Sequence, residues 1–142
     1  MAFCAIYIVA GLDARFGWSV MPLVTLIPGL LLYTISAVLG GWALIVNKHF
    51  EATARIQKDR EHTVITSGPY KLVRHPGYLS ALLGVAAVPL VLGSYVAFSC
   101  SIVVCFVMAI RTRLEDRMLR QELKGYSDYA EKVRYRLVPF IW

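Results

Sequence analysis

The chain has 142 residues, which is enough for one domain, but its composition is unlike that of a soluble domain of this size. Hydrophobic residues make up 58% of the sequence and the mean hydropathy is +0.59, which indicates an integral membrane protein. The net charge of +6 does not predict a nucleic-acid partner, because the basic residues gather in blocks beside apolar runs.

The first 46 residues contain two apolar runs of different length. Residues 1–12 are too few to cross a bilayer, which needs ~20 residues, so we expect a partial helix there, and no signal peptide because a basic leader is lacking. Residues 13–19 predict a short loop with aromatic anchors. Residues 22–46 hold 25 positions without a charge and predict one full transmembrane span.

A second apolar region covers residues 78–110, which include 33 positions without a charge. The region is too long for a single span, and it is somewhat short for two full spans joined by a loop. Pro89, Gly93 and Ser94 lie near the middle, where a helix-breaking residue and turn formers favour a reversal. We therefore expect a helical hairpin over about 78–110.

The C-terminal block predicts an amphipathic cytosolic helix over 111–123 and a second short helix before Pro139. The first would be ended by Gly125, and Asp116 with Arg120 is interpreted as a solvated ion pair. The apolar positions of the first helix are Leu114, Met118, Leu119 and Leu123, and those of the second are Tyr126, Tyr129, Val133 and Leu137.

The distribution of basic residues predicts the topology. One of the 15 lies before the first full span, six lie between residues 47 and 77, and eight lie after residue 110. A span followed by a returning hairpin places both rich blocks on one side, and the positive-inside rule makes that side the cytosol. The sequence thus predicts a multi-pass, all-α membrane protein with one domain, 1–142, in which 1–46 form N-terminal helices and 47–142 form the functional core.

Polar chemistry is concentrated in residues 62–78, between the two long apolar regions. Gly68 and Pro69 predict a turn, and Pro76 restrains the backbone of His75. Such a fixed loop suits a binding site facing cytosolic metabolites. An ordered loop that caps a helix, with His75 as a cap or interface residue, explains the same residues.

Arg111 and Glu115 stand four residues apart where the hairpin leaves the membrane, so they share a helix face. Ionisable groups at membrane depth are costly and often functional, although an ordinary ion pair is the alternative. A metal site is not predicted, because His49, His62 and His75 lack a carboxylate or thiol at ligand spacing. The three cysteines show no metal-binding or disulfide pattern.

An ordered set of motifs resembles the isoprenylcysteine carboxyl methyltransferase family. The set comprises TSGPY at 66–70, RHPGY at 74–78, an apolar hairpin, Arg111-Thr112 before Glu115-Asp116, and Gly125-Tyr126 with Tyr129 before Val138-Pro139. The resemblance covers about two thirds of the chain, from residue 47 to its end. It implies an all-helical membrane enzyme that transfers a methyl group from S-adenosylmethionine, without a metal, to a lipophilic substrate that enters from the bilayer.

The resemblance also implies roles for individual residues. Arg111 would orient the substrate carboxylate and act as the catalytic and substrate-binding residue. Those that would bind the methyl donor are Gln57, His62, Thr63, Val64, Ile65, Tyr70, His75, Pro76, Gly77, Tyr78 and Glu115.

The chemistry is compatible with these roles. A carboxylate is ionised at neutral pH and attacks a methylsulfonium in line, so positioning is the main catalytic demand. The acceptor would be a prenylcysteine-like carboxylate. Two alternatives remain open: a phospholipid-amine N-methyltransferase, which would need a proton acceptor, and a non-catalytic membrane module that binds lipid.

Overall fold

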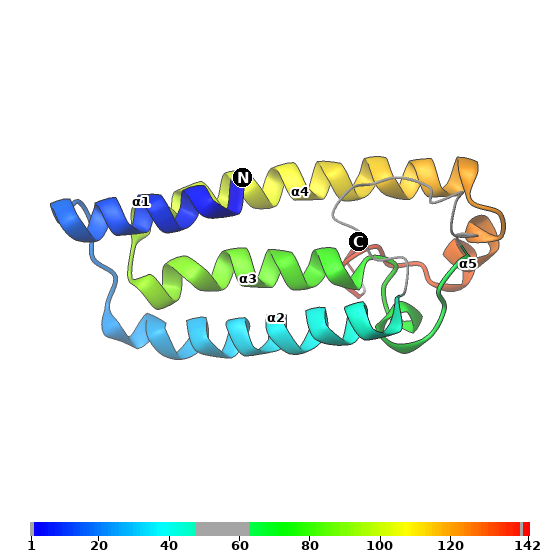
Figure 1. The fold of residues 1–142 in the computed structure, drawn as a ribbon, viewed down its shortest axis with the longest axis horizontal. Helices are drawn as coiled ribbons and strands as arrows, with labels where there is room; N and C mark the ends of the chain where they lie inside the picture. The colour runs from blue at the N-terminus through cyan, green and yellow to red at the C-terminus, as the bar shows by residue number, and fades with distance from the viewer. Residues whose placement is uncertain (1, 48–62, 140) are drawn as a thin grey trace. The chain divides into compact units, whose positions relative to one another are not determined.

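The computed structural model describes residues 2–47, 63–139 and 141–142, and these residues form helices joined by short loops (Figure 1). No strand occurs within the described ranges, so the predicted all-α class is confirmed. In chain order the elements are α1 (Ala2–Phe16), η1 (Leu23–Thr25), α2 (Leu26–Val46), η3 (Gly68–Lys71), α3 (Pro76–Leu92), α4 (Tyr95–Glu122) and α5 (Tyr126–Lys132).

The chain divides into two compact units. Unit 1 consists of Met1–Val38 and Ser80–Ala109, and unit 2 consists of Leu39–Leu79 and Ile110–Trp142. Unit 1 contains α1, the first part of α2, most of α3 and the first part of α4, whereas unit 2 contains the end of α2, the start of α3 and the last part of α4 together with η3, α5 and the C-terminal segment.

Small residues bring α2 and α3 close together in unit 1. Ser36 and Ser80 donate their hydroxyls to each other's carbonyl oxygens, both at 2.8 Å. A Cβ atom on Gly29 would lie 2.9 Å from Val91, and one on Gly84 would lie 2.9 Å from the Ser36 hydroxyl. Glycine is thus required where the backbones approach.

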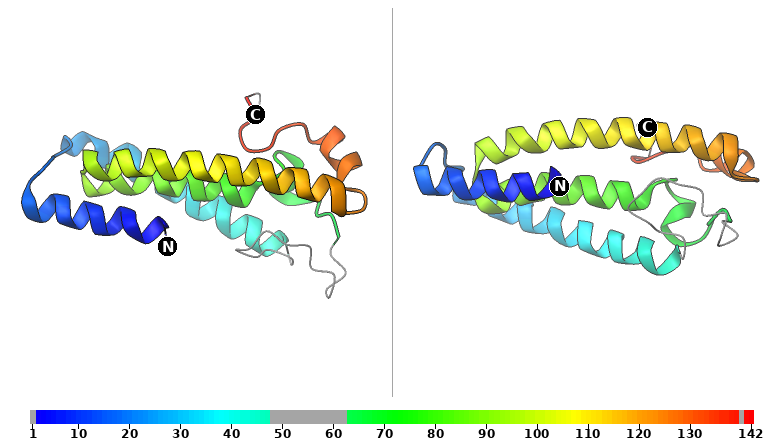
Figure 2. Two further views of the ribbon diagram at one scale, coloured as in Figure 1. Left: turned by 90° about the horizontal axis from the view of Figure 1, so that it is seen from above. Right: turned by 45° about the horizontal axis from the view of Figure 1, so that its top comes forward.

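Helix α1 packs against the α3–α4 hairpin through a small apolar core. Ile6 and Ala10 of α1 contact Val85 and Val88 of α3 and Ala97 of α4. Figure 2 shows α1 and the hairpin from two further sides. The partial N-terminal helix predicted from the sequence is therefore present, and it is anchored by apolar contacts.

Asp13 connects α1 to the hairpin turn. Its carboxylate accepts hydrogen bonds from the Ser19 backbone N–H at 2.7 Å, from the Ser19 hydroxyl at 2.5 Å and from the Ser94 hydroxyl. Ser94 in turn accepts the Ala97 N–H at the start of α4, which is an N-cap. The prediction that residues 13–19 are a loop was wrong for its first part, because Asp13 is fully buried and α1 continues to Phe16.

The reversal of the hairpin lies at Gly93 and Ser94. Gly93 has a φ of 71°, a left-handed conformation that glycine adopts without strain. Pro89 lies inside α3 and does not break it. The predicted hairpin is thus confirmed, with its turn near the middle of residues 78–110.

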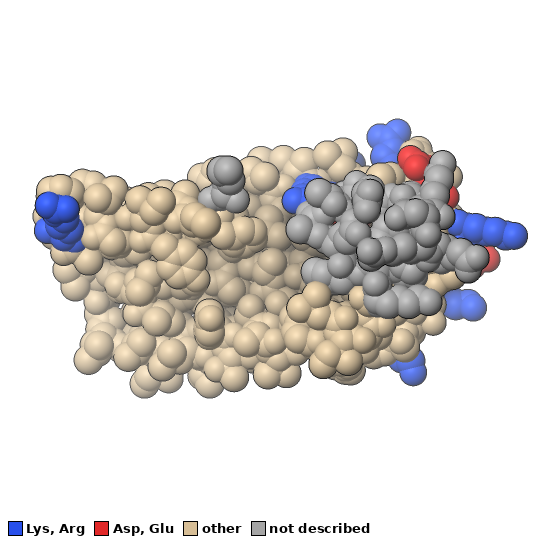
Figure 3. Space-filling model, in the orientation of Figure 1, with Lys and Arg blue, Asp and Glu red and all other residues tan. Residues whose placement is uncertain are grey.

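In the part of the chain that the structure describes, two helical segments are long and apolar enough to cross a membrane: Leu23–Val46 and Tyr95–Glu122. Only 11% of the apolar window in the first segment and 22% of that in the second are buried, whereas the core helix of a soluble protein would be mostly covered. The surface of unit 1 seen in Figure 3 carries few charged side chains, which suits contact with lipid.

Helix α4 continues without a break from the apolar region into the charged one, so the predicted amphipathic helix is its last part. Leu119 and Leu123, two positions of the predicted apolar stripe, lie in a cluster with residues of α5. Leu114 does not, since 61% of its surface is exposed. The buried face of this part of α4 carries Thr112 and Asp116 instead, because these positions are one helical turn apart. Helix α5 ends at Lys132, before the Leu137 position expected within it.

Candidate functional site

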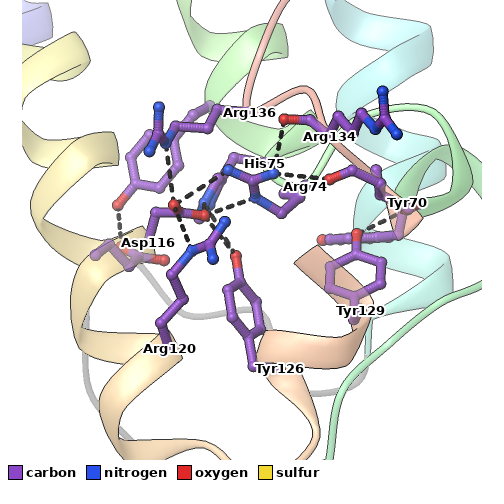
Figure 4. Close-up of polar contacts among 12 residues, drawn as sticks. Tyr70, Arg74, His75, Asp116, Arg120, Tyr126, Tyr129, Arg134 and Arg136 are labelled. Carbon is purple, nitrogen blue, oxygen red and sulfur yellow. Dashed lines mark hydrogen bonds and ion pairs between the residues drawn. The ribbon is translucent and has the colours of Figure 1, made fainter. Parts of the chain in front are cut away.

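Asp116 is the centre of a polar network in unit 2 (Figure 4). Its side chain is 1% exposed, and it accepts hydrogen bonds from Arg74 Nε at 2.7 Å, Arg136 Nε at 3.0 Å and the Tyr126 hydroxyl at 3.0 Å. The His75 Nε2 atom lies 3.3 Å from the same carboxylate. The interpretation of Asp116 and Arg120 as a solvated pair was wrong: Arg120 is a more distant partner, at 3.4 Å, of a buried charge.

Arg74 connects this network to the C-terminal segment. Its guanidinium donates to the carbonyl oxygens of Val133 at 2.7 Å and Arg134 at 2.8 Å. The backbone N–H groups of Arg74 and His75 donate to the carbonyls of Tyr135 and Arg136, both at 2.9 Å. A charged side chain that is 2% exposed is stable only when its donors are satisfied, and here the partners come from both α4 and the C-terminal segment.

Two tyrosines of α5 complete the packing. Tyr126 and Tyr129 lie in an apolar cluster with Leu123 and Ala130, and the Tyr129 hydroxyl donates to the Tyr70 carbonyl at 2.7 Å. Burial raises the pKa of Tyr126 and of Tyr129 well above the ordinary value, since it disfavours the phenolate. Gly125, with a φ of 83°, makes the sharp turn that brings α5 back beside α4.

A second polar group lies beside this network and involves Glu115, the residue of α4 that precedes Asp116. The Tyr78 hydroxyl donates to Glu115 Oε2 at 2.5 Å, and the Arg111 guanidinium lies 5.7 Å from the centre of the Tyr78 ring. Arg111 is exposed, whereas Tyr78 and Glu115 are partly buried. A cation, a carboxylate and a phenol thus meet where α3 begins and the uncharged part of α4 ends.

The segment leading into η3 contains further predicted residues. Residues 63–66 have no regular secondary structure, and the backbone hydrogen bonds recorded within the described residues include none made by their N–H or C=O groups. Thr63 is exposed and Val64 and Ile65 are half-buried, and their role toward a methyl donor stays a prediction. Tyr70 is buried, and its hydroxyl accepts a hydrogen bond from Asn47 Nδ2 at 2.9 Å.

Gly68 fixes the position of η3. Its φ is +57°, and a Cβ atom there would lie 2.8 Å from Val46 Cγ2 and 3.1 Å from Trp42 Nε1. Only glycine fits both the backbone conformation and the contact with the end of α2. The predicted turn at Gly68 and Pro69 is therefore present, and it places Tyr70 in the core.

The structure brings together three of the predicted site residues, Tyr78, Arg111 and Glu115. Gln57 and His62 lie outside the described residues. Pro76 is buried and begins α3, followed by Gly77. His75 is 6% exposed, its carbonyl accepts the Leu79 N–H at 3.1 Å, and its ring is 5.9 Å from that of Tyr78. It therefore has the features of the capping residue considered above, while its role toward a methyl donor stays a prediction.

Sequence reasoning missed the network around Asp116. A signal was available in the helix period, because Thr112, Asp116 and Leu123 are spaced as one face of a helix and are all buried. Because Thr112 and Asp116 are polar, this buried face does not appear in the sequence as an apolar stripe. Glu115 and Asp116 are adjacent and therefore point in different directions.

Comparison with known protein families gives a match over more than half of the chain. The model of the isoprenylcysteine carboxyl methyltransferase family matches residues 29–121, a range that includes η3, α3 and the charged part of α4. The chain belongs to this family. The match contains the Tyr78, Arg111 and Glu115 group and both partners of the buried Arg74–Asp116 pair.

Proteins of plants and of a bacterium are similar to shorter or longer parts of the chain. A probable protein-S-isoprenylcysteine O-methyltransferase of Oryza sativa is 34% identical over 80% of this chain and 60% of its own length. Protein-S-isoprenylcysteine O-methyltransferase B of Arabidopsis thaliana is 28% identical over 80% of this chain and 58% of its own length. The cobalt-zinc-cadmium resistance protein CzcN of Cupriavidus metallidurans is 32% identical over 51% of this chain and 34% of its own length. The chain spans about 60% of the length of the rice relative.

Proposed function

We propose that this family member transfers the methyl group of S-adenosylmethionine to the carboxylate of a lipophilic, prenylcysteine-like substrate. The observation that carries the proposal is the grouping of Arg111, Tyr78 and Glu115, in which a cation stands beside a phenol that is hydrogen-bonded to a carboxylate at 2.5 Å. Family membership and the names of the plant relatives support the same chemistry.

The residues have chemistry that fits both reactants. S-adenosylmethionine carries an ammonium, a sulfonium and ribose hydroxyls, which a carboxylate such as Glu115 attracts, and the backbone groups of 63–66 offer hydrogen bonds. Arg111 is exposed and can grip a carboxylate in a bidentate manner. In our proposal Glu115 binds the donor and Arg111 orients the acceptor.

The reaction balances without a base. One carboxylate oxygen forms a bond to the methyl carbon, the bond from that carbon to sulfur breaks, and its electron pair stays on the sulfur as a neutral thioether. Alignment of two bound reactants can supply ~7–11 kcal/mol of the barrier. The main contribution of the chain is therefore position, which the buried Arg74–Asp116 pair secures by fixing α4 to the segment before α3.

The location proposed for this reaction is the cytosolic side of a membrane that the chain crosses more than once. The two apolar helical segments and the concentration of basic residues in unit 2 support it. The acceptor, with a lipid-like chain, would reach Arg111 from the bilayer because this residue follows the uncharged part of α4.

Two measurements on detergent-purified protein test the proposal. Calorimetry should show binding of S-adenosylmethionine to the wild type. Incubation with methyl-labelled donor and a farnesylated cysteine should then give a labelled ester that alkali cleaves to methanol, while the corresponding amide remains unlabelled. Alkali-stable labelling of a phospholipid amine would instead identify an N-methyltransferase, and no donor binding would favour a non-catalytic module.

A further inference from the structure

A shallow basic groove lies in unit 2, on residues that the proposed methyl transfer does not use. It has a volume of about 420 Å³. The residues that line it are Lys71, Leu72, Lys132, Val133, Arg134, Tyr135 and Pro139. They come from the end of η3, the end of α5 and the segment that follows, so the groove forms only when these three pieces are folded together.

The three cations of the groove point outward. Lys71, Lys132 and Arg134 are all exposed, and the ion pairs recorded within the described chain include none of them. Asp128, four residues before Lys132 on α5, forms no recorded ion pair with it. In Figure 4 the Arg134 side chain extends away from Asp116, while its carbonyl faces Arg74.

The walls of the groove are held by the Arg74 contacts described above. The carbonyl oxygens of Val133 and Arg134, two of the lining residues, accept hydrogen bonds from Arg74, so these acceptors already have a partner. The backbone pairing of Arg74 with Tyr135 keeps Leu72 beside the C-terminal segment. The exposed polar groups of the groove thus include the cationic donors of Lys71, Lys132 and Arg134.

Exposed apolar side chains accompany the cations. Leu72 is 62% exposed, Val138 38% and Ile141 80%. Cations next to exposed aliphatic groups are the combination found where a protein meets the boundary between headgroups and acyl chains. A soluble polyanion would have no use for the aliphatic part, whereas a phospholipid has both a phosphate and acyl chains.

We propose that this groove binds the phosphate of an anionic phospholipid headgroup, with Lys71, Lys132 and Arg134 as its cationic partners and Leu72 against the first part of the acyl chains. The volume suits a headgroup and its glycerol rather than a whole lipid. Binding is independent of methyl transfer, and it would secure η3 to the C-terminal segment, so an occupied groove stabilises unit 2.

The test uses the full chain in a neutral maltoside detergent. Thermal unfolding is followed while dioleoylphosphatidylglycerol is added, with dioleoylphosphatidylcholine as the zwitterionic reference and sodium phosphate as the free anion. We expect phosphatidylglycerol to raise the midpoint temperature in a saturable manner and phosphatidylcholine to have little effect. Each cation near an anionic lipid contributes a factor of roughly five, and the three factors multiply, so K71Q/K132Q/R134Q should raise the half-saturating concentration by roughly 100-fold.

Two matched variants make the result specific. R113Q/R117Q/K124Q removes the same charge from exposed positions outside the groove and should change half-saturation less than ~3-fold. K71R/K132R/R134K keeps the charges and should bind like the wild type. Equal losses in the two glutamine triples, no stabilisation of the wild type by phosphatidylglycerol, or saturation by sodium phosphate at similar concentrations would each overturn the proposal.

Discussion

The carboxylates of Glu115 and Asp116 are adjacent in α4 and have different surroundings. Glu115 accepts the Tyr78 hydroxyl at 2.5 Å and is partly buried, whereas Asp116 is 1% exposed and bound by Arg74 at 2.7 Å. One turn of helix thus presents a carboxylate available to a ligand on one face and a structural carboxylate on the next. Substitutions of the two should therefore have different effects.

Replacement of Glu115 should weaken donor binding without unfolding the protein. We expect Glu115→Gln, which keeps the size of the side chain but removes its charge, to raise the dissociation constant for S-adenosylmethionine by roughly 10- to 100-fold, because hydrogen bonds to charged groups contribute about 1.5–3 kcal/mol. Tyr78→Phe should have a smaller effect, since it only frees Glu115 from its partner. Calorimetry on both variants checks this, and unchanged affinity in Glu115→Gln would refute its assigned role.

Substitution of Arg111 should lower turnover without weakening the binding of the methyl donor. Arg111→Ala is expected to lower kcat/KM for the lipophilic carboxylate by roughly 10- to 100-fold, because a charge-assisted contact to the acceptor is lost, while the affinity for S-adenosylmethionine stays within about twofold. Arg111→Lys should recover part of the activity, since it keeps the charge but not the bidentate geometry. Equal losses of donor affinity and turnover in Arg111→Ala would show that Arg111 does not act on the acceptor alone.

Asp116 should be a determinant of stability. Asp116→Asn removes the charge that compensates Arg74, which is 2% exposed, and breaking a buried ion pair costs ~3–5 kcal/mol. We expect a large fall in the unfolding temperature in detergent. Asp128→Asn, at an exposed position of α5, is the matched control and should change little. Similar small effects of both substitutions would mean that the Asp116 network contributes little to folding.

The apolar part of the fold was predictable from sequence because hydropathy and length constrain membrane helices strongly. Residues 22–46 and 78–110 became α2 and the α3–α4 hairpin, and family motifs located Tyr78, Arg111 and Glu115. The helix period indicates that Asp116 lies on a buried face, but its partners Arg74, Tyr126 and Arg136 were not predictable, because they are distant in sequence and only tertiary contacts join them. Asp13 was predicted to lie in a loop for a related reason, because a charged residue after an apolar run suggests a loop. In the structure the hydroxyls of Ser19 and Ser94 donate hydrogen bonds to its buried carboxylate.

Asp13 should hold α1 against the hairpin. Asp13→Ala leaves the hydroxyl of Ser94 without its acceptor, and we expect it to lower the unfolding temperature and to increase proteolysis near residue 17. Asp13→Asn should be intermediate, because an amide oxygen can still accept up to two of the three hydrogen bonds. Arg15, exposed in the same helix turn, provides the control as Arg15→Ala. An Asp13→Ala protein as stable as the control would show that apolar contacts alone hold α1.

Stability should decline in strongly alkaline solution. Burial raises the pKa of Tyr126 and Tyr129 in the folded chain above the unfolded value of about 10. The folded state therefore binds more protons than the unfolded state above pH 10, so the free energy of unfolding is unaffected below that pH and falls as pH rises beyond it. Unfolding temperatures between pH 8 and pH 11 (about one unit past the reference value) check this, and Tyr126→Phe should make the decline shallower. A pH-independent midpoint across that range would contradict the buried, neutral state of both side chains.

Alanine substitutions at Gly68 and Gly17 separate the energetic cost of backbone strain from that of lost packing. Gly68→Ala forces alanine into a φ of +57° and places its Cβ 2.8 Å from Val46, whereas Gly17→Ala meets a similar φ of +65° with no atom within 4 Å. The left-handed conformation costs about 1–2 kcal/mol at either position, so any further loss at Gly68 comes from the displaced contact with α2. We expect Gly68→Ala to lower the unfolding temperature clearly more than Gly17→Ala. It should also weaken S-adenosylmethionine binding, since η3 follows the segment proposed to hold the donor. Equal effects of the two substitutions on stability would mean that α2 and η3 yield to the added methyl group.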